Sequence, residues 1–340
     1  MTGERAARHE LCIARVVQET ADARSFVLEI PPALEATFAY EAGQFCTFRA
    51  DIDGERVVRS YSMSSSPAAG EPLTTTVKRV PGGRMSNWMI DTLTPGATIE
   101  VMRPTGRFVL RDHAAPIVAF AGGSGITPVI SLVKTALLTT ERPILLVYAN
   151  RSRDAVIFAG ELERLRAGAA GRLTVHHHLD CEHGYLDPVG CADLAAAHRG
   201  AADLYSCGPA PFMDVVDAGA SLLGIPAEQR FTERFVTSGD APAPTPDAAP
   251  ESITIRLDRK RHTVRYHAGD TVLEAARRGG LRPPFSCEAG NCATCMAHLD
   301  GGTVTMRTNN ALSDEEVADG WILTCQSVPA SAELAVDYDA

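Results

Sequence analysis

Residues 287–295 read CEAGNCATC, and a fourth cysteine, Cys325, follows after 29 further residues. Four thiolates can converge on a pair of bridged irons when three come from one tight loop and the fourth from a distant strand. Several residues in the loop are small, so backbone amides can turn toward bridging sulfides, and Gly290 can take the positive φ that such a loop needs. The pattern predicts an iron–sulfur centre with four ligands, namely Cys287, Cys292, Cys295 and Cys325.

The spacing C-x4-C-x2-C…C is that of plant-type [2Fe–2S] centres, which work near roughly −400 mV and pass one electron at a time. Zinc is a weaker alternative, because zinc sites usually show paired C-x2-C units or histidines, and this segment has one C-x2-C. A Rieske centre would need two histidines in the loop, and cysteines that are merely buried would not crowd in this way. The chain has nine cysteines in all, and this odd number argues against a disulfide framework.

Length and composition describe an ordinary globular chain with several domains. The 340 residues are 45% hydrophobic and 22% charged, which excludes a disordered or collagen-like protein. The formal net charge of −10 argues against nucleic acid and anionic membrane surfaces as partners. The sequence contains no run of eighteen apolar residues and no secretory signal at its charged start, so we expect a cytoplasmic protein.

Pattern and composition divide the chain into four segments. Residues 1–112 hold six short strand-like runs separated by turns, and these predict an antiparallel Greek-key β-barrel. Residues 113–235 alternate apolar strands with helices, which predicts a doubly wound parallel α/β domain. Residues 236–251 are rich in Pro and Ala and predict a linker. Residues 252–340 hold a hairpin, a helix and the cysteine loop, so the whole is a multidomain protein of α+β and α/β class.

Two runs in the barrel segment are typical of a flavin site. Arg59-Ser60-Tyr61-Ser62 offers a cation for a phosphate, an aromatic ring for the isoalloxazine and a hydroxyl for N5. Taken alone, this run is equally compatible with an ordinary strand at the solvent edge. Residues 80–86, VPGGRMS, form a glycine-rich turn before a helix, where free backbone N–H groups suit a pyrophosphate. Ser86 can cap that helix and can also bond the phosphate.

A glycine-rich loop in the second segment is typical of a nucleotide site. Residues 121–128, AGGSGITP, follow an apolar strand and open a helix, which we expect Thr127 to cap. The glycines allow a pyrophosphate to approach the backbone closely, although the loop departs from the Rossmann pattern G-x-G-x-x-G. The run Cys207-Gly208-Pro209 ends a later strand. His176–His178 alternate along a strand and cannot all face one metal, so we interpret them as strand.

These runs, together with GRFVL at residues 106–110, resemble the ferredoxin–NADP reductase superfamily, and residues 252–340 resemble a plant-type ferredoxin domain, a β-grasp sheet. The resemblance implies FAD as the flavin, although members of the phthalate dioxygenase reductase kind bind FMN. It implies three catalytic residues, Tyr61, Ser62 and Cys207, with Cys207 beside the reacting nicotinamide carbon. It also implies a set of cofactor-binding residues: Arg59, Tyr61, Ser62, Lys78, Gly82, Gly83, Arg84, Met85, Ser86, Gly122, Gly123, Ser124, Gly125, Thr127, Cys207, Gly208, Pro209 and Phe235.

The order of the domains resembles the reductase components of multicomponent oxygenases. Residues 305–329, TMRTNNALSDEEVADGWILTCQSVP, look most like the reductases of 3-ketosteroid 9α-hydroxylases, and the reductase subunits of phenylacetyl-CoA epoxidases are a close second. The resemblance implies electron transfer from NAD(P)H through FAD and [2Fe–2S] to a terminal oxygenase of Rieske or di-iron type. NADH is favoured over NADPH, although Arg151 or Arg153 could bind a 2′-phosphate. A non-catalytic redox sensor and a reductase that forms NADPH are the alternatives.

The end of the chain is strongly acidic. Residues 311–340 hold seven carboxylates and no Lys or Arg. This pattern predicts either a docking face for a partner or a segment that serves solubility alone.

Overall fold

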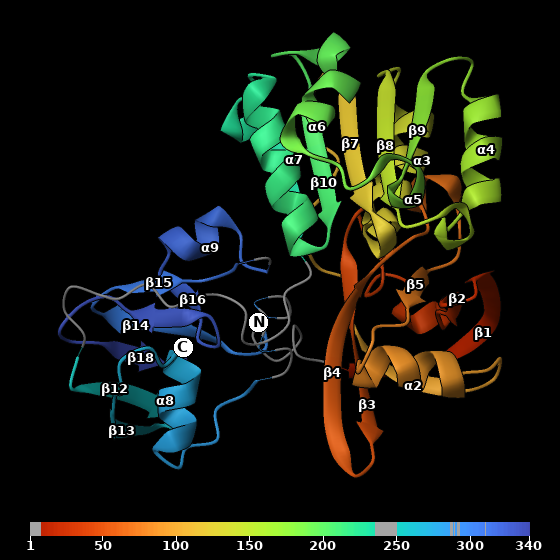
Figure 1. The fold of residues 1–340 in the computed structure, drawn as a ribbon. Coiled ribbons are helices and arrows are strands. Elements are labelled where there is room, and N and C mark those ends of the chain that lie inside the picture. Colours follow the sequence, from red (N-terminus) through yellow and green to blue (C-terminus); the bar gives the residue numbers. More distant parts are fainter. Residues whose placement is uncertain (1–7, 235–249, 286–287, 289, 291–292, 310) are drawn as a thin grey trace.

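The computed structural model describes residues 8–234, 250–285, 288, 290, 293–309 and 311–340, which form three sheet-based bodies (Figure 1). The predicted linker lies outside the described residues except for Pro250 and Glu251. Among the described helices, none combines the length and the apolar content that a membrane crossing requires.

The first body is the predicted antiparallel barrel. Its six strands follow the order β4-β3-β6-β1-β2-β5, and an isolated bridge between Met63 and Thr75 joins the two ends of this order. Helix α2 packs Met85, Met89 and Ile90 into the barrel core. The elements are β1 (Arg8–Thr20), β2 (Ala23–Glu29), η1 (Pro32–Leu34), β3 (Phe45–Ile52), β4 (Glu55–Ser62), η2 (Pro67–Ala69), β5 (Thr74–Lys78), α2 (Arg84–Thr92) and β6 (Thr98–Met102).

The second body is the predicted doubly wound domain, with five parallel strands in the order β11-β10-β7-β8-β9. Every residue of β7, β8 and β10 is buried, as expected for a sheet covered by helices on both faces (Figure 1). His176–His178 lie in β9, which confirms their interpretation as strand. The elements are β7 (Ile117–Gly122), η3 (Gly123–Gly125), α3 (Ile126–Thr139), β8 (Ile144–Asn150), η4 (Arg153–Ala155), α4 (Ala159–Gly168), β9 (Leu173–Leu179), α5 (Asp180–His183), α6 (Pro188–Leu194), η5 (Ala196–His198), β10 (Asp203–Gly208), α7 (Ala210–Leu222), η6 (Ala227–Gln229) and β11 (Arg230–Arg234).

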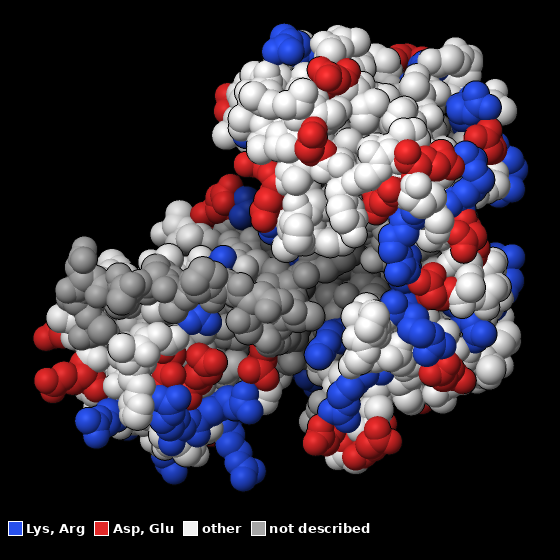
Figure 2. Space-filling view, in the orientation of Figure 1, with Lys and Arg blue, Asp and Glu red and all other residues white. Residues whose placement is uncertain are grey.

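The third body is a mixed sheet of order β13-β12-β18-β14-β16 with helix α8 packed on it, which is the β-grasp arrangement expected for a ferredoxin-type domain. Thr271 begins α8 with a capping box to Glu274. Acidic side chains gather over α9 in the space-filling view (Figure 2). The elements are β12 (Ser252–Leu257), β13 (Lys260–Arg265), α8 (Val272–Arg278), β14 (Met296–Gly301), β15 (Val304–Met306), α9 (Asp314–Ala318), β16 (Trp321–Leu323), β17 (Ser327–Pro329) and β18 (Ala335–Asp337).

Helix α3 fastens the doubly wound domain to the barrel. Ser131 donates a hydrogen bond to the Ser65 carbonyl at 2.6 Å and accepts one from the Gly43 N–H at 3.3 Å. Lys134 is buried and forms an ion pair with Glu71 at 2.7 Å. A second carboxylate, that of Glu161, lies 3.1 Å from the same ammonium, so carboxylates from both bodies balance the buried charge. These contacts fix the carboxyl ends of the parallel strands against the barrel.

Candidate functional site

The carboxyl ends of β10 and β11 meet the end of β4 at a buried polar contact. The Ser62 hydroxyl donates a hydrogen bond to Oε2 of Glu233 at 2.8 Å. The parallel register of β10 and β11 places Glu233 directly beside Cys207. All three side chains are buried, with exposed fractions of 2%, 6% and 0% for Ser62, Glu233 and Cys207. The structure thus brings together the hydroxyl predicted for the flavin and the thiol predicted for the nicotinamide.

Burial sets the protonation of this contact. It raises the pKa of Glu233 to about 7, although the hydrogen bond from Ser62 opposes the rise. Burial also raises the pKa of the Cys207 thiol, and the neighbouring carboxylate adds to the effect. Cys207 is therefore a neutral thiol at physiological pH, suited to lining a ring and not to nucleophilic attack.

Glu233 is a candidate site residue that the sequence motifs did not reveal. The residue predicted near the flavin was Phe235, which lies outside the described residues, and strand β11 was not expected. The sequence did contain a signal for this strand. Phe231, Glu233 and Phe235 alternate with Thr232 and Arg234, and this period of two is typical of a strand.

Replacing Glu233 by Gln is expected to remove a carboxyl band that titrates near pH 7 in the infrared spectrum. Because the folded protein raises this pKa above 4.5, its native state binds the proton more tightly than its unfolded state does. The contribution of this carboxyl to the free energy of unfolding is therefore fully present below about pH 4.5. It is lost as the pH rises through 7, and its upper bound is about 3 kcal/mol. The measurement is the difference spectrum of wild type and Glu233→Gln between pH 5 and 8. A carboxyl that is already ionised at pH 5 would contradict the assignment.

The glycine-rich turn before α2 fits a flavin pyrophosphate. Gly82 has a φ of +70°, and a Cβ on Gly83 would lie 2.5 Å from the Ser86 hydroxyl oxygen. Gly83 is the N-cap residue and no side chain caps the helix, so the first backbone N–H groups of α2 are open to an anion. The donor set therefore suits a phosphate group.

The expectation that Ser86 caps α2 is wrong. The helix begins at Arg84, so Ser86 is its third residue, and its hydroxyl accepts a hydrogen bond from the Val80 N–H at 3.3 Å. The Arg84 guanidinium pairs with Glu55 and donates to the Ile52 carbonyl at 2.8 Å. The charged group of Arg84 is therefore engaged by the barrel, which leaves its backbone N–H as the group available to a phosphate.

The other predicted flavin residues occupy different places. Tyr61 is half-buried against Phe48, and burial raises the pKa of its hydroxyl well above the usual range, so the ring stays neutral. Arg59 is exposed and donates to the Val58 carbonyl at 2.7 Å. Lys78 ends β5, with Nζ 3.7 Å from Oδ2 of Asp22, and takes no part in the contact at Ser62.

The nucleotide loop packs directly on the end of β10. A Cβ on Gly125 would lie 2.1 Å from the Cys207 carbonyl oxygen, and one on Gly122 would lie 2.9 Å from the Phe212 ring. Gly208 faces the same ring, and Gly123 has a φ of +54°. Glycine at these positions therefore lets the loop and the Cys-Gly-Pro turn touch, which is the close approach that a dinucleotide needs.

The expectation that Thr127 caps the helix after this loop is wrong. A 3₁₀ turn over Gly123–Gly125 leads into α3, whose N-cap is Gly125. Thr127 lies inside the helix and donates its hydroxyl to the Ser124 carbonyl at 3.0 Å. No side chain caps α3, but the Ile126 N–H already donates to the Gly123 and Ser124 carbonyls, and Pro128 has no N–H. A phosphate would therefore be met by the glycine loop before the helix.

Two of the four predicted cluster ligands lie side by side in the third body. Cys295 and Cys325 are buried and share an apolar cluster with Leu312. Thr324 holds them together by donating its N–H at 3.2 Å and its hydroxyl at 2.8 Å to the Cys295 carbonyl. Cys287 and Cys292 lie outside the described residues. The adjoining cysteines fit a thiolate-held cluster.

One described residue of the cysteine loop, Gly290, has the predicted backbone conformation. Gly290 has a φ of +74°, and a Cβ there would lie 2.7 Å from the Thr308 carbonyl oxygen. The Gln326 amide donates to the Glu288 carbonyl at 2.9 Å and lies 3.7 Å from the sulfur of Cys325. An amide donor near a ligating sulfur is one of the means by which proteins adjust a cluster potential.

Fold and site together define an electron-transfer flavoprotein that carries its own iron–sulfur domain. Three family models match the chain: an oxidoreductase FAD-binding domain at residues 11–110, an oxidoreductase NAD-binding domain at residues 120–218, and a 2Fe-2S iron-sulfur cluster binding domain at residues 255–330. The chain is 36% identical to the ferredoxin reductase component of 3-ketosteroid-9-alpha-monooxygenase from Mycolicibacterium smegmatis, with 100% of both chains covered.

It is also 33% identical to a component of the 1,2-phenylacetyl-CoA epoxidase from Escherichia coli, with 98% of both chains covered. The solved structure of phthalate dioxygenase reductase matches with a TM-score of 0.61 at 28% identity, over 99% of each chain. The chain belongs to the family of oxygenase reductase components with FAD-binding, NAD-binding and [2Fe–2S] domains. It is an NAD(P)H-dependent oxidoreductase, which confirms the predicted cofactors FAD, [2Fe–2S] and NAD(H).

Proposed function

We propose that this protein carries electrons from NADH to the terminal oxygenase of a steroid 9α-hydroxylating system. The observation that carries the electron-transfer assignment is the buried contact of Ser62, Glu233 and Cys207, since it joins the flavin barrel to the nicotinamide domain. The relative from Mycolicibacterium smegmatis, which matches over the full length, supports the steroid assignment.

The side chains at this contact have distinct roles in the proposal. When bound, FAD supplies the change from two-electron to one-electron transfer, and the [2Fe–2S] cluster supplies a one-electron relay. Ser62 orients its hydroxyl by donating to Glu233, and Glu233, with a pKa of about 7, holds or releases a proton at Oε2. Tyr61 covers the ring as a neutral aromatic group, and the Cys207 thiol lines the nicotinamide position.

We assign the phosphate groups to the uncapped start of α2 and to the glycine loop before α3. The N–H groups at Arg84, Met85 and Ser86 would hold the flavin pyrophosphate, and the glycine loop at residues 122–125 would hold the pyrophosphate of the nicotinamide dinucleotide. The four thiolates Cys287, Cys292, Cys295 and Cys325 would hold the cluster.

We infer that NADH is used in preference to NADPH. Arg151 and Arg153 follow the carboxyl end of β8, where this strand order places the adenosine end of a dinucleotide. Oδ2 of Asp22 lies 3.7 Å from the Arg151 guanidinium. This carboxylate offsets the positive charge that a 2′-phosphate would need.

The variant with both Arg151→Ala and Arg153→Ala is expected to change kcat/KM for NADH by less than about threefold, because an exposed guanidinium contributes little without a phosphate partner. The measurement is the initial rate with NADH and with NADPH for wild type and variant. A wild type that uses NADPH as well as NADH, and loses that activity in the variant, would contradict the inference.

The identity of the terminal oxygenase decides which substrate the proposed system oxidises. We expect product formation from a 3-ketosteroid when the holoprotein and NADH are mixed with a purified Rieske oxygenase of the 9α-hydroxylating type. Epoxidation of phenylacetyl-CoA by a di-iron oxygenase is the second candidate, which the relative from Escherichia coli supports. The test is product formation in parallel mixtures with the two oxygenases. Turnover with the di-iron oxygenase alone would overturn the steroid assignment.

A further inference from the structure

One arginine of the barrel reaches across to the ferredoxin-type domain. Arg107 follows β6 and donates from Nη1 to the Leu312 carbonyl at 3.1 Å and from Nη2 to Oδ1 of Asp314 at 2.7 Å. Leu312 lies just before α9, and Asp314 is its first residue. One guanidinium therefore forms two hydrogen bonds with the segment that leads into α9, which lies more than 200 residues further along the chain.

The segment that Arg107 holds adjoins the cysteine pair. Leu312 is fully buried and shares an apolar cluster with Cys295 and Cys325. Its backbone is fixed by Asn309, which donates to the Leu312 carbonyl at 3.0 Å and accepts from the Leu312 N–H at 2.9 Å. A movement of this turn relative to the barrel would therefore carry the cysteines with it.

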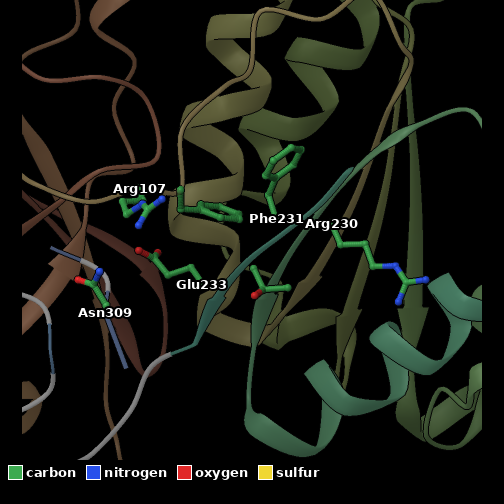
Figure 3. Close-up of a pocket in the computed structure, with 7 residues that line it drawn as sticks. Arg107, Arg230, Phe231, Glu233 and Asn309 are labelled. Atoms are coloured by element: carbon green, nitrogen blue, oxygen red, sulfur yellow. The ribbon is translucent and has the colours of Figure 1, made fainter. Parts of the chain in front are cut away.

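Arg107 also lines a cavity that reaches Glu233, the partner of Ser62 in the buried contact. Arg107 and Phe108 line a cavity of about 240 Å³ together with Asn309 and four residues of β11, among them Glu233 (Figure 3). The cavity thus has walls from all three domains. Arg107 therefore contacts the turn that adjoins Cys295 and Cys325, and it lines the same cavity as Glu233.

We propose that Arg107 is a positioning residue that docks the ferredoxin-type domain against the flavin site and so sets the rate of internal electron transfer. The inference rests on the proposed function. In the step concerned, one electron leaves the reduced flavin and reduces the cluster, and no bond to Arg107 forms or breaks. Because electron transfer slows steeply with distance, a small displacement of the docked domain has a large kinetic effect.

The contact is suited to reversible docking. Asp314 has an exposed side chain, at 88%, and Arg107 is partly exposed at 38%, so salt screens their attraction. The bond to the Leu312 carbonyl is directional and adds orientation to this attraction. Asp314 belongs to the acidic segment for which the sequence predicted a docking face or an aid to solubility. The structure uses this carboxylate within the chain.

The test is anaerobic stopped-flow reduction of the holoprotein by NADH, with the absorbance of the flavin and of the cluster followed separately. In Arg107→Ala, the flavin phase should stay within about twofold of wild type and the cluster phase should slow by about tenfold or more. Arg107→Lys keeps the charge and a hydrogen-bond donor, so the rate of its cluster phase should lie between those of wild type and Arg107→Ala. The matched control is Arg103→Ala, at an exposed arginine of the same connection, which should leave both phases unchanged.

A second variant guards against a folding defect. Asp314→Asn changes an exposed side chain and should make the cluster phase slower and less sensitive to added salt than in wild type. An unchanged cluster phase in Arg107→Ala, or equal slowing of both phases, would overturn the docking role. A wild type whose cluster NADH does not reduce at all would instead overturn the proposed function, so the two failures are distinguishable.

Discussion

Replacing Cys325 by Ser is expected to abolish NADH-dependent reduction of cytochrome c while NADH still reduces the flavin. Cys325 is 6% exposed and lies in one apolar cluster with Cys295, another of the predicted ligands. A hydroxyl is a much poorer ligand for cluster iron than a thiolate. We expect cytochrome c reduction to fall by about 100-fold or more, because the remaining flavin has no one-electron relay. The measurement pairs steady-state cytochrome c reduction with single-turnover flavin reduction.

The matched control for this variant is Cys191→Ser. Cys191 is 1% exposed in α6 of the nucleotide domain, and it undergoes the same change of sulfur to oxygen. It should keep both reactions, at a cost of about 1 kcal/mol in stability. Loss of flavin reduction in Cys325→Ser, with the flavin still bound, would contradict the proposed division of labour between the two cofactors.

Replacing Gly125 by Ala is expected to lower kcat/KM for NADH by about 100-fold or more. Gly125 has an ordinary φ of −61°, so the backbone alone would tolerate alanine. The new methyl group would, however, lie 2.1 Å from the Cys207 carbonyl oxygen, which is far inside contact distance. The nucleotide loop and the end of β10 would have to separate, and the predicted pyrophosphate and nicotinamide positions would move apart.

The measurement is anaerobic reduction of the flavin by NADH, with dithionite reduction of flavin and cluster as an internal reference. Gly125→Ala should be reduced by dithionite as completely as wild type, because dithionite reduces both cofactors without binding at the nucleotide loop. Gly168→Ala is the matched control, since a Cβ at this helix position would meet nothing within 4 Å. If Gly125→Ala reacted with NADH as fast as wild type, this loop would not be the nucleotide site.

Much of the fold was accessible from local patterns in the sequence. Six short β runs predicted the barrel, and alternating apolar strands and helices predicted the parallel sheet, because each pattern has its own period. The cysteine spacing predicted the cluster type, and Gly290 has the positive φ that the loop required. These features depend on residues that are close together in the chain or on the hydrophobic pattern alone.

The contacts that assemble the site could not be predicted from local sequence patterns. Ser62 and Glu233 are 171 positions apart, and Arg107 and Asp314 are 207 positions apart, so no local pattern links them. The caps expected at Ser86 and Thr127 were wrong because the N-cap residues of the two helices are glycines, Gly83 and Gly125, which precede them. A hydroxyl near a helix start suggests a cap, but a site for an anion needs the first N–H groups to be uncovered.

The measurement that tests the central claim most directly is a rapid-freeze experiment with NADH and the holoprotein under anaerobic conditions. The order NADH, flavin, cluster predicts that flavin absorbance bleaches first, and that the paramagnetic signal of the reduced [2Fe–2S] cluster grows as the flavin gives up one electron. A cluster that becomes reduced before the flavin changes, or one that stays oxidised after the flavin is fully reduced, would contradict the account.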